Sequence, residues 1–436
     1  MIVVVIHNLY FQRLIVNNGQ HMIKKIFFCF TILLKSSGLF AQLSAPQGVT
    51  GINNDLPRVI NTAVPFLLIS PDARSAGMGD IGAATKADAT AIFWNPGKLT
   101  FAQEEVGLNL SYTPWLSRIV PDMSISNIST YYKLNKQQTV GLELRYFDLG
   151  DVTFKSNSGA LLGDFRPREF AIGLTFSQIL VDDKFGIGLS SRYINSNLSG
   201  NILQNNNPDV RPGQSVAVDF GLYFQNVIAQ GARQAELAIG MALTNVGAKI
   251  YYTNEDHAQF LPTNLRLGSA YTLHLDPFNS FTFAVDFNKL LVPTPPSYLL
   301  DSNNNVVYNQ QNQPVVAQGR NSNQPLLSGM FGSFADAPNG LQEEIQEIMI
   351  STGIEYWHED KLAFRTGYFH ESKRKGGRRY MTFGTGFRYQ VFGLDIAYLV
   401  PFTANHPLSE TLRVSLVFDW KGNHPAGLQS NADAKE

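Results

Sequence analysis

The chain has 436 residues and a formal net charge of -1; only 16% of its residues are charged, whereas 12% are aromatic. With a net charge this close to zero, nothing suggests nucleic-acid binding or a polybasic membrane anchor. A soluble chain of this length usually forms two or three domains, but no linker between two cores is visible, which favours one large domain.

The N-terminal region has the pattern of an export signal behind an extra segment. Residues 22–25 are a positively charged start, and residues 26–34 are a short apolar run. This pattern predicts a secretory signal peptide over residues 22–41, too short for a membrane-spanning helix. Residues 1–21 are then an upstream extension from a misassigned start. The single cysteine, Cys29, lies in the signal, so the exported chain needs no disulfide.

Residues 42–60 are polar, and residues 61–104 contain no convincing strand pattern. The segment 76–80 is followed by a stretch of small residues and then by a Trp-Asn-Pro-Gly motif at 94–97. We predict an N-terminal periplasmic segment that includes a plug, or hatch, folded into the mouth of a barrel. The predicted hatch residues are Met78, Asp80, Trp94, Asn95 and Pro96.

Short segments with alternating apolar and polar residues fill positions 105–420. Residues two apart share a face of a strand, so Leu142 and Leu144 face one way while Glu143 and Arg145 face the other. The apolar face is free of charge in every segment, as expected for lipid contact, because a charge at the bilayer midplane costs roughly 2–4 kcal/mol. We therefore predict an all-β fold, a transmembrane antiparallel β-barrel of about fourteen strands in the cell outer membrane. The expected strands are 105–113, 123–133, 138–147, 169–177, 184–193, 216–225, 236–246, 263–272, 280–287, 350–357, 361–369, 379–389, 391–400 and 411–420.

The lengths of the connections support this count. Short connections, such as 135–137 and 358–360, alternate with longer ones, such as 148–168 and the longest, 288–349. Short periplasmic turns and long extracellular loops are typical of outer-membrane barrels. A polar tail, 421–436, follows the last strand.

The outer loops contain the residues that we expect to bind partners. An apolar, proline-rich run begins loop 288–349, and Leu341 and Ile345 share one side of a short helix near its end, mostly opposite a set of glutamates. A tryptophan with apolar neighbours also lies at the outer rim, where it could equally anchor the barrel at the lipid interface. The predicted partner-binding residues are Pro114, Trp115, Leu116, Leu290, Leu291, Val292, Pro293, Leu341 and Ile345.

The sequence contains no recognisable catalytic, cofactor-binding or metal-binding motif. Its histidines form no HExxH pair, and the acid–His group 255–257 is better explained as a solvated loop. The inward-facing charges could line a transport path, but mixed charges more often pair with one another and with the plug. The basic residues 373–375 and 378–379 could contact lipopolysaccharide phosphates or an acidic partner, or could be merely solvated.

Several motifs are spread over the exported part of the chain: residues 63–67, 75–80, 94–96, 111–116, 261–266 and 286–295. With these motifs the chain resembles the PorV family of type IX secretion system outer-membrane proteins, within the wider FadL-like barrel superfamily. The segment 288–296 is the most specific of them, whereas Trp94-Asn95-Pro96 is shared with FadL-type transporters.

The resemblance implies a non-enzymatic carrier without a cofactor. Its expected partners are an SprA-like translocon barrel, a PorU-like attachment complex, the C-terminal signal domains of secreted cargo, and outer-membrane lipid including lipopolysaccharide. The alternative is a FadL-type transporter of hydrophobic small molecules, which would need an apolar path through its lumen.

Overall fold

The computed structural model describes residues 51–52, 57–120, 122–155, 158–159, 161–181, 183–198, 200, 210–230, 233–253, 257–403 and 406–420. The predicted upstream extension, signal peptide and C-terminal tail lie outside these residues. The strands and helices described below belong to one compact unit, Gly51–Leu300 with Asn304–Glu436.

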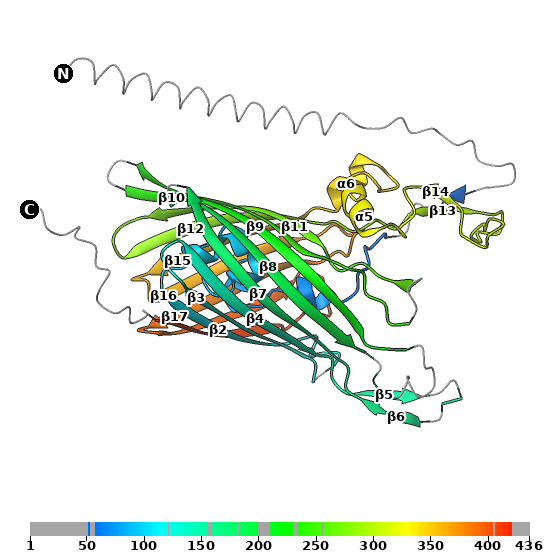
Figure 1. Cartoon of the computed structure of the whole chain (residues 1–436), viewed down its shortest axis with the longest axis horizontal. Helices are drawn as coiled ribbons and strands as arrows, with labels where there is room; N and C mark the ends of the chain where they lie inside the picture. Colours follow the sequence, from blue (N-terminus) through cyan, green and yellow to red (C-terminus); the bar gives the residue numbers. More distant parts are fainter. Residues whose placement is uncertain are drawn as a thin grey trace, which may run out of the picture. The chain divides into compact units, whose positions relative to one another are not determined.

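Fourteen antiparallel strands close into a barrel in which each strand pairs with the next barrel strand of the chain (Figure 1). The last strand pairs with the first, Trp420 opposite Val106 and Val414 opposite Tyr112, so the sheet has no free edge. The predicted fold class and strand number are confirmed, and each observed strand overlaps its predicted range. The strands are β2 (Val106–Pro114), β3 (Ser124–Lys133), β4 (Gln138–Asp148), β7 (Arg168–Val181), β8 (Phe185–Asn197), β9 (Gly213–Gln230), β10 (Arg233–Gly247), β11 (Asn264–His274), β12 (Asn279–Leu290), β15 (Met349–His358), β16 (Leu362–His370), β17 (Arg379–Tyr389), β18 (Phe392–Pro401) and β19 (Leu412–Trp420).

The strands turn their polar side inward and their apolar side outward. On β4, Glu143 and Arg145 are buried in the lumen, whereas Leu142 and Leu144 are exposed on the outer surface. Lipid replaces water around the barrel, so the apolar side chains belong on the exterior and the charges must find partners inside. This inside-out sorting makes the barrel a membrane-spanning structure.

The segment before β2, for which a hatch was predicted and which we call the hatch, lies inside the ring of strands (Figure 1). It is built from short helices rather than strands because Pro65 and Pro96 open two of them and Asp72 caps a third by accepting a hydrogen bond from Ser75 N. Its elements are η1 (Pro65–Leu68), α2 (Ala73–Gly77), α3 (Ala91–Trp94) and η2 (Pro96–Phe101).

The chain runs through the lumen from the end with long loops to the end with short turns. Arg58 forms an ion pair with Glu343 of loop 288–349, whereas Glu105 accepts a hydrogen bond from Lys133, next to a short turn. The short strand β1 (Gly51–Ile52) pairs with Leu299 and Leu300 of the same long loop. The first described residues of the segment predicted over 42–104 therefore lie with loop 288–349, at the end with long loops.

The long loops have secondary structure of their own. Strands β5 (Val152–Lys155) and β6 (Leu161–Phe165) form a hairpin in one loop. Loop 288–349 contains β13 (Ser297–Leu300), β14 (Val316–Gln318), α5 (Leu326–Gly332) and α6 (Leu341–Gln346). None of the helices in the described ranges has the length and apolar character to cross a membrane.

Candidate functional site

Buried ion pairs fasten the hatch to the barrel wall. Arg74 of α2 donates two hydrogen bonds to Glu355 of β15, at 3.0 and 2.9 Å. Glu355 also accepts from Arg365 of β16 at 2.7 Å, and Arg365 pairs with Asp395 of β18 at 2.8 Å. Removing one member of such a network leaves a buried charge without its partner, which is strongly destabilising. These lumen charges thus pair with one another and with the plug, in agreement with one of the two interpretations of the sequence.

Among the predicted hatch residues, Trp94 forms a hydrogen bond within the hatch, and Asn95 forms one within the hatch and one to the wall. Trp94 donates its indole N–H to Asp72 Oδ1 at 2.7 Å. Asn95 donates to the carbonyl oxygens of Ala83 at 3.0 Å and of Leu222 on β9 at 2.9 Å. These bonds satisfy groups that would otherwise be buried without partners, and the bond to Leu222 joins the hatch to a second side of the barrel.

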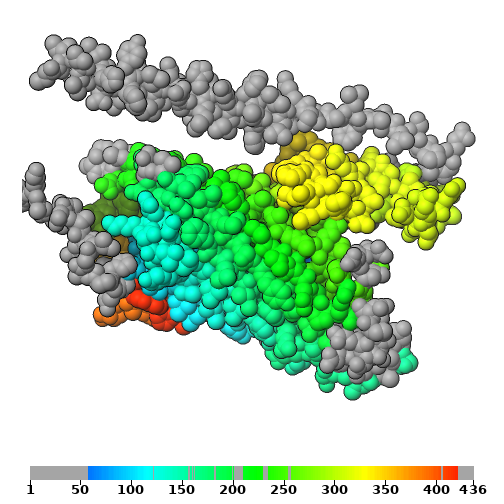
Figure 2. Space-filling view, in the orientation of Figure 1, coloured from blue at the N-terminus to red at the C-terminus, as the bar shows by residue number. Residues whose placement is uncertain are grey.

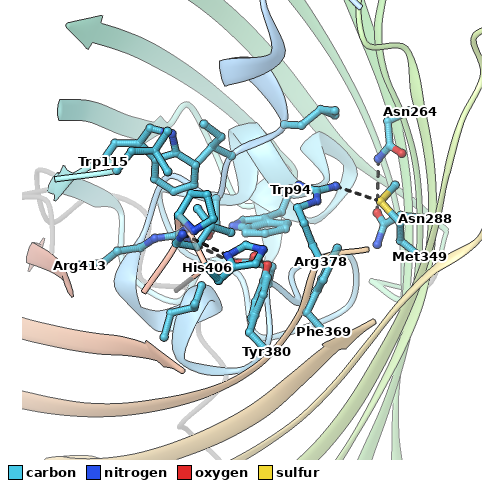
Figure 3. Close-up of a pocket in the computed structure, with 18 of the residues that line it drawn as sticks. Trp94, Trp115, Asn264, Asn288, Met349, Phe369, Arg378, Tyr380, His406 and Arg413 are labelled. Carbon is cyan, nitrogen blue, oxygen red and sulfur yellow. Dashed lines mark hydrogen bonds and ion pairs between the residues drawn. The ribbon is translucent and has the colours of Figure 1, made fainter. Parts of the chain in front are cut away.

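A pocket of about 290 Å³ lies between the hatch and the outer loops (Figure 3). Asp80 and Trp94 of the hatch line it together with Trp115 and Leu116 of the loop after β2. Asp80 accepts hydrogen bonds from Tyr380 and from Arg413, the latter at 3.2 Å. The structure therefore brings two predicted hatch residues and two predicted partner-binding residues to one place, which sequence spacing could not show.

The short helix α6 turns its acidic side inward and its apolar side outward. Leu341 and Ile345 are 73% and 59% exposed, whereas Glu343, Glu344 and the C-capping residue Glu347 are buried. Carboxylates are almost never fully buried unless they are paired. Basic residues must therefore lie beneath α6.

Three basic residues from distant parts of the chain supply that pairing. Arg58 binds Glu343 at 2.9 Å, and Lys375 binds Glu343 at 2.7 Å and Glu347 at 2.8 Å. Lys289, at the end of β12, pairs with Glu344 at 3.0 Å and also with Glu347. We call these six residues the loop charge cluster; its members are Arg58, Lys289, Glu343, Glu344, Glu347 and Lys375.

The basic residues 373–375 and 378–379, which form one group in the sequence, have different environments in the structure. Lys375 is buried in the cluster, and Arg378 forms two hydrogen bonds, both of 2.9 Å, with Glu371. Lys373 and Arg374 remain exposed. Only part of the predicted lipopolysaccharide-binding group is thus available to an external anion.

Asp336 lies against the loop charge cluster and makes it sensitive to pH. Burial, and then the charges of Glu344 and Glu347, raise the pKa of Asp336 to about 7, while Lys289 acts in the opposite direction. An acid whose pKa is higher in the folded state than in the unfolded state stabilises the fold below its unfolded value, near 4. That contribution is lost as pH rises through 7.

We therefore expect α6 to become less protected as pH rises from 5.5 to 8. Hydrogen exchange of residues 341–347, corrected for the intrinsic rate at each pH, measures this. In the Asp336→Asn variant the uncharged side chain does not titrate, so protection should lose most of this pH dependence. An equal slope in both proteins would contradict the assignment.

Loop 288–349 also exposes apolar residues around its two helices. Leu327, Phe331 and Phe334, in α5 and the turn after it, are exposed along with Leu341 and Ile345 of α6. We call these five residues the loop apolar patch; both helices belong to the yellow lobe in Figure 2. Large exposed apolar groups outside the membrane are typical of interaction sites.

The other predicted partner-binding residues of this loop lie inside it. Leu291, Val292 and Pro293 are buried, and Leu290 is half-buried. A Cβ added at Gly329 of α5 would lie 3.0 Å from Pro293 and 2.7 Å from Phe260, which places α5 directly over this run. The run 290–293 therefore packs beneath α5 through Pro293.

Several key residues gave no signal in the sequence. Arg58 and Glu343 are 285 positions apart, and Arg74 and Glu355 are 281 apart. The inward charges on the strands require counter-ions, but nothing in a single sequence says which residues supply them. Glu255 and Asp256 lie outside the described residues, so the acid–His group has no structural description.

Comparison with known proteins gives one family. The family model described as "Type IX secretion system protein PorV" matches residues 52–297, more than half of the chain. No curated protein matches at a significant level.

Solved structures similar to the chain include three outer-membrane barrels. The Ralstonia pickettii toluene transporter TbuX is 12% identical with a TM-score of 0.42, over 82% of this chain and 99% of that one. The P. putida toluene transporter TodX is 13% identical with a TM-score of 0.40, over 81% and 100%. A Pseudomonas aeruginosa FadL homologue is 12% identical with a TM-score of 0.37, over 84% and 100%.

The closed barrel with its lipid-facing exterior is of the outer-membrane type, and the family match covers the hatch and the strands through β12. The resemblance predicted from the sequence motifs is confirmed. The chain belongs to the PorV family of type IX secretion system proteins.

Proposed function

We propose that this protein is a non-enzymatic carrier of the type IX secretion system, exported by the signal peptide at residues 22–41. It receives the C-terminal signal domain of secreted cargo from an SprA-like translocon barrel and passes it to a PorU-like attachment complex at the cell surface. The loop apolar patch is the surface that binds the signal domain, beside the lipid and lipopolysaccharide that surround the barrel.

The observation that supports this proposal is the orientation of α6. An amphipathic helix on a protein surface ordinarily buries its apolar side, and α6 does the reverse. The loop charge cluster fixes this orientation, with buried carboxylates held at 2.7–3.0 Å by Arg58, Lys289 and Lys375. The exposed apolar side is therefore a stable feature of the folded loop and is suited to binding a partner.

The alternative, a transporter of hydrophobic small molecules, receives less support. Such a protein needs an apolar path through the lumen. Here the path would cross the ion pairs between Arg74, Glu355 and Arg365, all of them buried.

The double variant L341Q/I345Q should lose most of its capture of a purified cargo signal domain. Both changes are on exposed positions, so the barrel should fold as before, which heat-modifiability in gels can verify. The matched control is Leu161→Gln, on a side chain that is 67% exposed but lies in the β5–β6 hairpin.

Capture is measured by pull-down with the full chain in phospholipid nanodiscs. Unchanged capture by L341Q/I345Q would contradict the assignment of the loop apolar patch. An equal loss in Leu161→Gln would show that the effect is not specific to α6.

A further inference from the structure

The pocket above the hatch combines a positive charge with apolar walls. Three arginines line it, Arg266, Arg378 and Arg413, but only one carboxylate, Asp80. Asp80 is paired with Arg413 at 3.2 Å, and Arg378 is paired with Glu371 behind the pocket wall. Arg266 forms no direct ion pair with any described residue, although the charges of Asp286, Asp80 and Asp219 act on it, so it is the arginine of the lining that has no carboxylate bound to it.

Arg266 is held in place by neutral groups. Its Nε donates to Asn288 at 2.7 Å and its Nη1 to the carbonyl of Trp94 at 3.0 Å. Its guanidinium lies 4.6 Å from the centre of the Trp94 ring, and the side chain is 5% exposed. A guanidinium oriented in this way, with Nη2 unbonded to the described residues, is a preformed donor for an anion.

The walls around this donor are aromatic and aliphatic. Arg378 and Arg413 also lie over aromatic rings, 5.3 Å from Phe369 and 5.8 Å from Trp115. Leu399 and Leu408 complete the lining on the side of β18 and β19. Apolar walls with a few oriented polar groups are typical of small-molecule sites.

The one histidine of the lining adds no charge at neutral pH. Burial, and then the charge of Arg378, lower the pKa of His406 below its ordinary value.

Beneath the pocket, the hydrogen bond from Tyr380 to Asp80 joins β17 to the hatch. A molecule in the pocket therefore rests on the hatch.

We propose that this pocket binds a small organic anion, an apolar or aromatic body bearing one carboxylate, with the carboxylate on Arg266 and the body between Trp94, Trp115 and Leu408. The volume of about 290 Å³ is at the lower end of ligand sites, roughly 300–1,000 Å³, so the ligand is a compact one. This binding is separate from cargo capture by the loop apolar patch.

The test is isothermal titration of the full chain in nanodiscs with 2-naphthoate and with its neutral counterpart 2-naphthamide. We expect 2-naphthoate to bind one to one and 2-naphthamide to bind at least about tenfold more weakly, because a hydrogen bond to a charged group is worth about a factor of ten or more. Arg266→Met should reduce 2-naphthoate binding to the level of 2-naphthamide. Arg166→Met, a change at an exposed arginine that does not line the pocket, is the control and should bind as the parent does.

Leu408→Trp keeps every charge and fills the cavity, so it should abolish binding of both compounds, and it provides the decisive variant if Arg266→Met does not fold. The proposal is overturned if the parent protein does not bind 2-naphthoate, if it binds both compounds equally, or if Leu408→Trp and a folded Arg266→Met bind as the parent does.

Discussion

Glu355→Ala is expected to lower the free energy of unfolding by about 3–5 kcal/mol, the usual cost of breaking a buried ion pair. Glu355 is almost fully buried and accepts hydrogen bonds from both Arg74 and Arg365. In this variant Arg74 still has its ion pair with Asp88, at 2.9 Å, and Arg365 still has its ion pair with Asp395. Neither remaining carboxylate joins hatch to wall, so the hatch should also loosen.

Urea unfolding of the barrel, followed by tryptophan fluorescence, measures the stability change, and limited proteolysis reports release of the hatch. Glu359→Ala is the matched control, since Glu359 lies four residues away in an exposed pair with Lys361. Exposed pairs contribute little, so this variant should unfold as the parent does. Equal stability of the two variants would mean that the hatch is held by other contacts.

Gly367→Ala is expected to displace the hatch and to open an ion path through the barrel. A Cβ at Gly367 of β16 would lie 2.0 Å from the backbone carbonyl carbon of Met78 and 2.2 Å from Gly79 N. Backbone atoms cannot move away as a flexible side chain can, so the hatch itself must shift. Overpacking of this kind costs about 1–3 kcal/mol.

The control is Gly173→Ala on β7, where the nearest atom to an added Cβ is Ser191 O at 3.7 Å, an ordinary contact. Both glycines face the lumen, so only the closeness of the hatch distinguishes them. Planar-bilayer recordings should show higher ion conductance for Gly367→Ala than for Gly173→Ala or the parent. Identical conductance in all three would show that the hatch tolerates the added methyl group.

The barrel was predictable from the sequence because two different environments impose the strand pattern. Lipid requires an unbroken apolar face, as at Leu142 and Leu144, and this requirement applies to every strand without knowledge of the partner strands. The hatch was predictable only as a region without strands. Its attachment to the wall by Arg74 and by Asn95 depends on contacts between distant residues, which no local pattern encodes.

In loop 288–349, too, the sequence pattern could not predict which apolar residues are exposed. Leu291 and Val292 were predicted to bind partners, but they are buried. An apolar, proline-rich run has the same appearance whether it meets another protein or the rest of its own loop. The exposed side of α6 was visible as a pattern, whereas the basic residues that turn its glutamates inward come from three separate segments.

The passage of the chain through the lumen has a consequence for biogenesis. Arg58 lies at the loop end, β2 begins at the turn end, and the seam between β2 and β19 joins the first and last strands of the ring. If the barrel closed first, the N-terminal segment would have to be pulled through a closed ring of strands. That step is avoided if the strands assemble around the hatch and the pairing of β2 with β19 forms last, and we expect this order of assembly.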